Sequence, residues 1–282
     1  MINSFTLQDS SLNNTIIAIF LIALLIMIFY FGFKMVEMAY VMKYKKPLYN
    51  HFYLKLKRLN PNQKSVLKNN FYFFSKLNHK QKRYFEHRVA EFIKDKTFIG
   101  RDGLLMTDEV KVLISATAVM LTFGFRDFYI GLIDKVFVYP NPFYSTTNKN
   151  HHKGEFNPKL KSIVFSWEDF KHGYNVGDDN LNLGIHEFAH AIHLNSIKER
   201  DVSSTIFKDS FNELTTLLSN NKSLRDKLIA SKYFRAYAYE NQFEFLAVLV
   251  EYFFETPKEF QSQFPKIYSK VKQMLNFNYA SY

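Results

Sequence analysis

The sequence predicts an α+β fold, in which a mainly helical domain with a small β-sheet follows a single transmembrane helix. Three observations support this fold class. An uncharged apolar run lies close to the N-terminus. Downstream of about residue 76, apolar residues recur at helical spacing in most segments. Only two short runs, 135–140 and 162–167, are rich in β-forming residues and bounded by turn residues.

The apolar run at residues 16–33, IIAIFLIALLIMIFYFGF, carries no charge. Its length is about what a helix needs to cross a bilayer of roughly 30 Å. A cleaved signal peptide would begin with positive charge and have a shorter apolar stretch, whereas Asp9 is the only charged side chain before this run. A buried core helix is the other alternative, but the preceding residues offer it no partner. We therefore expect a short tail at 1–12 and a transmembrane helix at 13–33.

The net charge of +11 is concentrated in residues 34–96, which hold 16 Lys and Arg against four Asp and Glu. The C-terminal flank of the apolar run is basic and its N-terminal flank has no Lys or Arg. The positive-inside rule then places residues 34–282 in the cytoplasm, behind a single-pass anchor. The flanking cations are Lys34, Lys43, Lys45 and Lys46.

Residues 34–75 are interpreted as a basic juxtamembrane linker. Its later cations can lie along anionic lipid headgroups or coat a solvated helical linker, and the sequence leaves both open. They are Lys55, Lys57, Arg58, Lys64 and Lys68. No base-reading motif accompanies the charge, so we expect no direct contact with nucleic acid. The absence of cysteine excludes disulfides, thiolate metal ligands and a cysteine nucleophile.

Residues 76–282 are predicted to form the globular domain. Asn78 with Gln81 is a capping-box start for one helix, and Thr107 opens a second helix that Gly124 can close. Between the two predicted strands, residues 141–160 form a polar loop that can overhang a cleft. Helical patterns continue to the C-terminus.

The run NLGIHEFAHAIHLNS at 182–196 places His186 and His190 four residues apart. On a helix both imidazoles leave the same face and can hold one metal ion. Glu187 is rotated by about 100°, so it can reach a water on that ion instead of becoming a ligand. Two satisfied core histidines with a surface glutamate are the alternative, although burying these groups unpaired in an apolar helix would be costly.

A catalytic zinc site of this kind needs a third protein ligand. His193 starts a turn beyond the point between His186 and His190, so packing or contact with a ligand suits it better than zinc binding. Farther along, Asn241 can cap a helix with Glu244 at its N3 position and Glu251 on the same face. A capping-box role for Glu244 and a surface role for Glu251 are the alternatives. Pro257 breaks this helix.

Four pieces of the sequence resemble the Mlc titration factor A family of zinc-dependent peptidases, which are gluzincin-like, with HExxH plus a distant glutamate. The matching pieces are VYPNPF (138–143), VFSWEDF (164–170), LNLGIHEFAH (181–190) and EFLAVLVEYFFETP (244–257). The resemblance covers roughly 76–270, in order, and implies a zincin-type metallopeptidase domain whose active site is similar to that of the anthrax lethal factor catalytic domain.

The resemblance implies that Zn²⁺ is held by His186, His190 and Glu244. It implies that Glu187 is the general base and that Tyr237, seven residues before the third ligand, is a further catalytic residue. His193 is a departure, because family members often have an acidic residue there. A difference in metal affinity or pH dependence is the expected consequence.

These residues indicate a membrane-anchored zinc peptidase that hydrolyses peptide bonds with a zinc-bound water activated by Glu187. Its partner is then a peptide or protein substrate, and the family suggests aminopeptidase-like action on short peptides. The strand at 162–167 is expected to offer its edge to an extended peptide. The alternative is a binding module that sequesters a transcriptional regulator at the membrane, with minor peptidase activity.

Overall fold

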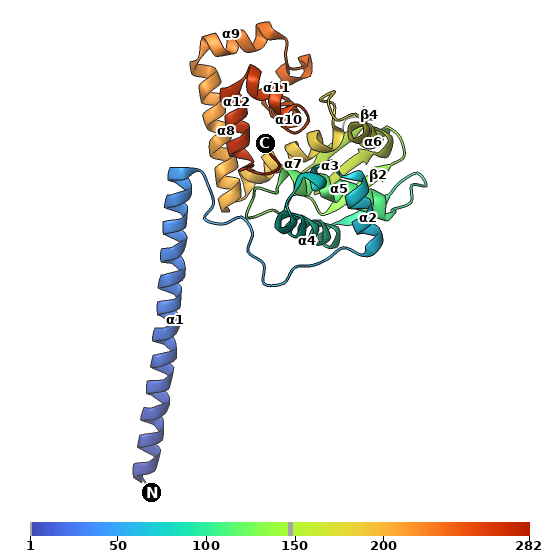
Figure 1. The fold of residues 1–282 in the computed structure, drawn as a ribbon. Coiled ribbons are helices and arrows are strands. Elements are labelled where there is room, and N and C mark those ends of the chain that lie inside the picture. Colours follow the sequence, from blue (N-terminus) through green and yellow to red (C-terminus); the bar gives the residue numbers. More distant parts are fainter. Residues whose placement is uncertain (1, 146–148) are drawn as a thin grey trace. The chain divides into compact units, whose positions relative to one another are not determined.

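The computed structural model describes residues 2–145 and 149–282. The chain forms two compact units, one ending at Leu48 and one running from Tyr49 to Tyr282. The first unit consists of helix α1 (Ile2–Tyr44). The second contains the remaining helices and all the strands that the structure describes (Figure 1).

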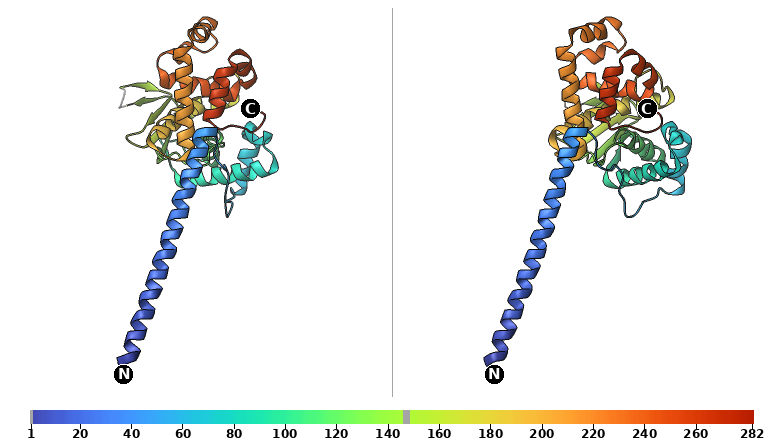
Figure 2. Two further views of the ribbon diagram at one scale, coloured as in Figure 1. Left: turned by 90° about the vertical axis from the view of Figure 1, so that its left-hand side faces the viewer. Right: turned by 60° about the vertical axis from the view of Figure 1, so that its left-hand side comes forward.

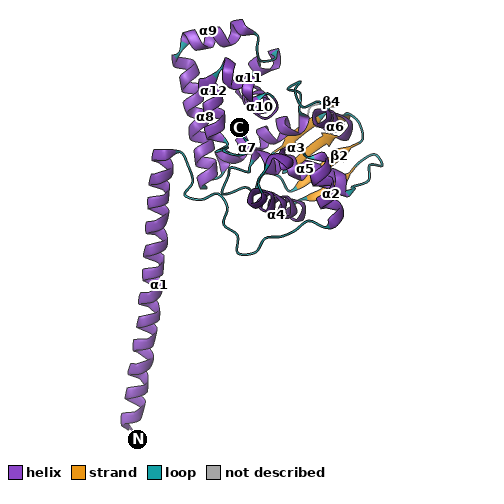
Figure 3. Cartoon of the chain, viewed as in Figure 1, coloured by secondary structure: helices purple, strands orange, loops and turns teal. Residues whose placement is uncertain are grey.

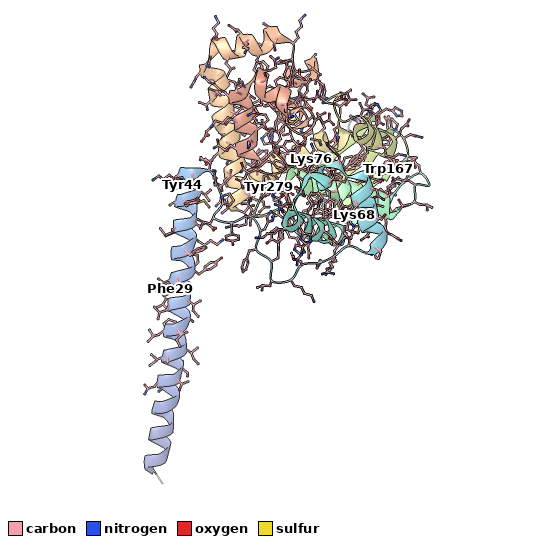
Figure 4. All side chains as sticks on the ribbon, in the orientation of Figure 1. Phe29, Tyr44, Lys68, Lys76, Trp167 and Tyr279 are labelled. Atoms are coloured by element: carbon pink, nitrogen blue, oxygen red, sulfur yellow. The ribbon has the colours of Figure 1, made fainter. Side chains whose placement is uncertain are left out.

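Helix α1 contains a stretch, Asn13–Tyr44, that is long and apolar enough to cross a membrane. None of its most apolar window is buried within the structure, which argues against a core helix. Apolar side chains such as Phe29, labelled in Figure 4, are exposed along it. The helix extends beyond the predicted 13–33 in both directions, because the flanking residues contain neither Pro nor Gly.

The second unit begins well before the predicted boundary at residue 76. After an irregular stretch, α2 (Pro61–Asn70) and α3 (Tyr72–Lys76) pack into it. Its core includes Leu59 and Leu67. The segment expected to be a linker therefore belongs, from Tyr49 onward, to the folded domain, since apolar side chains such as Leu59 and Leu67 are buried in its core and its basic ones are largely on the surface.

A four-stranded mixed sheet has the order β1-β2-β6-β5. Strands β1, β2 and β6 are parallel, and β5 pairs antiparallel with β6. Strands β3 and β4 form a separate antiparallel pair. The strands are β1 (Thr97–Gly100), β2 (Lys135–Tyr139), β3 (Phe143–Ser145), β4 (Asn150–His152), β5 (Gly154–Asn157) and β6 (Ser162–Ser166).

The position of β6 corrects the expectation that it offers a free edge, because β2 and β5 occupy both of its sides. The end strand beside it is β5. The polar loop predicted at 141–160 contains β3, β4 and β5 in its described part, while residues 146–148 lie outside the described residues.

Helices make up most of the rest of the second unit (Figure 3). They are α4 (His79–Asp95), α5 (Asp108–Leu121), α6 (Trp167–Asn175), α7 (Leu183–Lys198), α8 (Val202–Asn220), α9 (Lys222–Ser231), the 3₁₀ turn η1 (Ala236–Tyr239), α10 (Gln242–Glu255), α11 (Pro257–Gln263) and α12 (Pro265–Met274). In both views of Figure 2, α8 runs beside α12. Rings from the sheet and helices meet in the core, where Phe165 and Phe92 both contact Phe188.

Two helix starts follow the sequence signals. Asn78 and Gln81 form the capping box of α4, and the Thr107 hydroxyl caps α5. Gly124 does not end α5, whose C-cap is Thr122. A Cβ at Gly124 would lie 2.2 Å from the carbonyl oxygen of Leu275, so glycine is needed there for close backbone approach.

Candidate metal centre

Helix α7 carries the HExxH residues along a buried path through the domain. Asn182 caps it by accepting a hydrogen bond from the Ile185 backbone N–H (3.0 Å). The apolar side chains of Ile185, Phe188 and Ile192 are buried in the core. The packing of α7 thereby fixes the direction in which its two metal-site histidines point.

Three donor atoms converge at one point between α7 and α10. His186 Nε2 lies 3.1 Å from His190 Nε2 and 3.0 Å from Glu244 Oε2. His190 Nε2 lies 3.5 Å from the same carboxylate oxygen. The Asn241 side chain caps α10, while the Glu244 side chain points to the two imidazoles. The structure thus brings Glu244 to two histidines that lie more than fifty positions earlier in the chain.

The spacing of these atoms fits a tetrahedral metal ion. Zinc bonds of about 2.0–2.1 Å place neighbouring tetrahedral ligands about 3.3 Å apart. The three observed separations, 3.0, 3.1 and 3.5 Å, bracket that value. His186, His190 and Glu244 therefore form a group that could hold a metal ion. The nitrogen and oxygen donors suit zinc, although they do not identify the metal.

Glu251 fixes the orientation of one of these imidazoles. It lies two turns after Glu244 on α10 and is only 1% exposed. His186 Nδ1 lies 2.7 Å from Glu251 Oε1 and donates to it, because a carboxylate only accepts, so Nε2 is the ring nitrogen that faces the centre. Arg235 neutralises Glu251 through contacts of 2.6 and 3.0 Å to its two oxygens.

The same carboxylate also joins the two helices of the centre. Oε2 of Glu251 accepts a hydrogen bond from the backbone N–H of Asn182 at 3.0 Å. The Asn182 side chain donates to Gly173 O and to Glu255 Oε1. The start of α7 is consequently bound to α10 close to the point where the ligands meet.

Glu187 lies beside the metal-site residues and is 8% exposed. Gly154, the first residue of β5, packs directly against it. A Cβ at Gly154 would lie 2.7 Å from both Cγ and Oε1 of Glu187, so this approach requires glycine. The end strand of the sheet therefore begins next to the carboxylate that sequence reasoning assigns as the base.

A cleft of about 580 Å³ opens over this centre. Its walls include His186 and Glu187 from α7, the segment 151–154, and Tyr237 from η1. The Tyr237 ring lies 5.8 Å from that of His186 and is 41% exposed, so its hydroxyl group is accessible from the cleft. The structure thus brings Tyr237 to the same site.

His193 lies apart from the three converging donors. Its ring packs against Phe211 (4.6 Å) and Phe243 (4.9 Å), and its side chain is buried. Burial, and then the nearby His190, lower the pKa of His193 to about 4. It is thus a neutral ring in an aromatic setting.

The metal-free centre has an electrostatic preference for a cation. Burial alone would lower the pKa of His186, but hydrogen bonds to Glu244 and Glu251 raise it to about 9. The hydrogen bonds from the histidines hold the pKa of Glu244 below its ordinary range although burial opposes this. Burial raises the pKa of Glu187, with the histidines opposing. Carboxylates that stabilise a protonated imidazole here would also stabilise a divalent cation.

Comparison with known proteins decides the family. The profile described as "Glucose-regulated metallo-peptidase M90" matches residues 48–276. The chain belongs to this family. The match confirms the predicted resemblance and begins earlier than residue 76, in agreement with the start of the second unit at Tyr49.

Two proteins illustrate what this M90 chain is similar to. An uncharacterized protein of Synechocystis sp. (strain ATCC 27184 / PCC 6803 / Kazusa) is 24% identical over 237 residues, 76% of this chain and 83% of that protein. Mlc titration factor A of Yersinia pestis (strain Pestoides F) is 24% identical over 195 residues, 64% of this chain and 72% of that protein. The chain is thus a metallopeptidase-family member with a His, His, Glu group suited to a metal.

Sequence reasoning missed two residues of this M90 site. Glu251 was left between a surface charge and an alternative ligand, although its position within the apolar run FLAVLVEYFF was a signal of burial. Arg235 was not singled out, because nothing in its neighbouring residues marks it. Its partner is sixteen residues away, so only the fold reveals the pair.

Proposed function

We propose that this chain is a membrane-anchored, zinc-dependent peptidase. The observation that carries the proposal is the convergence of His186, His190 and Glu244 within 4.8 Å of one another, beside Glu187 and at the base of a cleft. A bound zinc ion would supply Lewis acidity, polarising a peptide carbonyl and lowering the pKa of water towards about 7.

Glu187 is placed to act as the general base. Its carboxylate accepts a proton from the attacking water and delivers that proton to the leaving amine nitrogen. Burial raises its pKa, which suits a group that must both take and release a proton. Its contact with Gly154 holds it close to the site where the substrate backbone would lie.

Tyr237 is placed to donate a hydrogen bond to the oxyanion that develops on the scissile carbonyl. Burial, and then the charge of Glu244, raise the pKa of its hydroxyl group, so it keeps its proton in the physiological range. Its position in the cleft, with its ring against that of His186, supports this role.

We place an extended peptide along β5 instead of β6, since β5 is an end strand and starts beside Glu187. The family resemblance favours aminopeptidase-like action on short peptides. The apolar stretch within α1 and the basic residues after it support a single-pass anchor with the peptidase domain in the cytoplasm.

Glu187→Gln tests the mechanism. The variant should bind zinc as the parent does and lose peptide hydrolysis by roughly 10²–10⁴-fold, because the amide cannot accept the proton. Metal content and cleavage of a peptide library, measured on the full chain in detergent, report the two properties separately. Retained hydrolysis would show that Glu187 is not the base.

A second candidate function is capture of a transcriptional regulator at the membrane, with minor peptidase activity. Its support is the name of the relatives, Mlc titration factor A. The Glu187→Gln variant separates the two functions. Under the capture hypothesis it still retains a regulator on membranes, whereas under the peptidase hypothesis its cellular effect is lost together with hydrolysis.

A further inference from the structure

The segment at residues 49–60, which precedes α2, displays apolar side chains to solvent. Phe52 is 72% exposed and Leu54 is 96% exposed. The residues between and around them point the other way: Asn50, His51 and Tyr53 are partly buried. A surface segment normally has its polar side chains outward, so this alternation is inverted.

Hydrogen bonds tie the inward side of this segment to α4. Arg88 donates to the carbonyl oxygen of Asn50 (2.9 Å) and to the hydroxyl of Tyr53 (2.6 Å). The Lys57 backbone N–H donates to His87 Nδ1 at 3.0 Å. Asn50 also donates to the hydroxyl of Tyr279, which Figure 4 labels. The exposed apolar tips are thus presented by an anchored backbone.

Positive charge surrounds the apolar tips. Lys55, Arg58 and Arg83 are exposed, and together with Leu54 they line a depression of about 700 Å³. Lys57 contributes less free charge, because Glu91 pairs with it at 2.6 Å. The surface therefore combines an apolar tip with a cationic rim.

The position of this surface in the chain points to its partner. Phe52 follows the end of α1 by only eight residues, which span at most about 30 Å when fully extended. If α1 crosses a bilayer, this short connection keeps the surface within reach of the headgroups. A bilayer with anionic lipids offers an apolar interior for Phe52 and Leu54 and phosphates for the cationic rim.

We propose that residues 52–58, together with Arg83, form a peripheral contact with an anionic lipid surface. The two apolar side chains enter the boundary between headgroups and acyl chains, and the cationic rim binds the lipid phosphates. This contact adds a second attachment that fixes the orientation of the folded domain. It rests on the proposed membrane anchoring and is independent of peptide hydrolysis.

The lack of native cysteine allows a direct test with single nitroxide labels in the full chain. Leu54→Cys is labelled and the protein is reconstituted into phosphatidylcholine vesicles with and without phosphatidylglycerol. Collisions of the label with oxygen and with a water-soluble nickel chelate report its depth. In anionic vesicles we expect the label to lose nickel collisions and gain oxygen collisions.

Matched controls show which side chains cause the label at position 54 to enter the bilayer. Leu105→Cys labels another exposed leucine, 79% exposed, and should stay in water. Combined Lys55→Glu, Arg58→Glu and Arg83→Glu should return the label at 54 to water. The same charge change made with Lys222→Glu, Lys258→Glu and Lys266→Glu, all exposed lysines of the domain, should not.

A label at Leu25→Cys in α1 separates the contact from the anchor. If that label is immersed while those at 54 and at Phe52→Cys stay in water, the lipid contact is refuted and the anchor stands. If all three stay in water, the anchor is refuted as well. Immersion of the label at 54 to the same depth with and without phosphatidylglycerol would refute the requirement for an anionic lipid surface.

Discussion

Two charged side chains of the domain, Arg88 on α4 and Glu251 on α10, are both buried. Their hydrogen-bond networks differ in whether they leave polar atoms available to a ligand. Arg88 is fully buried and donates to the hydroxyl of Tyr53 and to several backbone carbonyl oxygens, including that of Phe125 at 2.7 Å. Its network is closed. Glu251 is 1% exposed and binds Arg235 and His186.

The network of Glu251 ends in atoms that remain directed at one another. Beyond His186, the lone pairs of His190 and Glu244 converge on the same point. A closed hydrogen-bond network such as that of Arg88 stabilises the fold. A network such as that of Glu251, which ends in converging metal-ligand atoms, prepares a binding site. Burial of the charge does not distinguish the two networks, since both charges are buried. They differ in what the hydrogen-bond partners of the charge contact in turn.

Arg88→Met gives the largest expected effect of the two networks. It leaves buried carbonyl oxygens without donors and should lower the free energy of unfolding by about 3–5 kcal/mol. Urea unfolding in detergent measures the loss. Zinc affinity per folded molecule should stay unchanged, with Arg88→Lys as an intermediate control. A variant that keeps its stability but loses zinc would contradict a purely structural role.

Glu251→Gln should change zinc affinity, the property that Arg88→Met leaves unchanged. An amide oxygen orients His186 less strongly and leaves Arg235 without its counter-charge, so zinc affinity should fall roughly 10–100-fold. Competition with a chromophoric chelator measures it. Glu213→Gln, a change to a partly exposed carboxylate on α8, serves as the control. Equal zinc affinity in the Glu251 variant and the parent would remove the functional distinction between the networks.

His51, a neighbour of Arg88, gives the smallest effect. Burial, and then the charge of Arg88, lower the pKa of His51 from 6.5 to about 3. The unfolded chain therefore takes up the proton first as the pH falls. The contribution of His51 to the free energy of unfolding is fully present above pH 6.5 and is lost as the pH falls toward 3. At pH 5.5 the loss is about 1 kcal/mol.

The unfolding free energy measured from pH 7.5 to 5.5 tests this linkage. His51→Phe should show a shallower pH dependence than the parent, because one proton-binding group is removed from the unfolded state. An unchanged slope would mean that His51 is protonated in the folded domain, and that the Arg88 network has room for a second charge.

The sequence predicted the helical parts of the fold because their signals are local. The capping box at Asn78 and the cap at Thr107 lie next to the helices they start. Strand β5 escaped prediction since its residues GEFN have low strand propensity, and pairing with β6 holds them extended. The domain boundary was misplaced because basic side chains obscured the buried Leu59 and Leu67.

The residues of the candidate site differ in how far the sequence alone predicts them. The spacing of His186 and His190 on one helix follows from helix geometry. Glu244 came only with the family resemblance, because no local rule connects two helices so far apart in sequence. Arg235 needed the fold itself. The assignment of these residues to metal binding stays a prediction.

The shortness of β5 limits how a peptide can be held. Four residues with alternate groups facing outward offer at most about four backbone hydrogen bonds, which at about 1 kcal/mol each correspond to a dissociation constant near 1 mM. Backbone pairing could then align a substrate without retaining it. Any selectivity beyond that would depend on side chains of the cleft wall, such as His151 and Lys153, which differ in shape and reach.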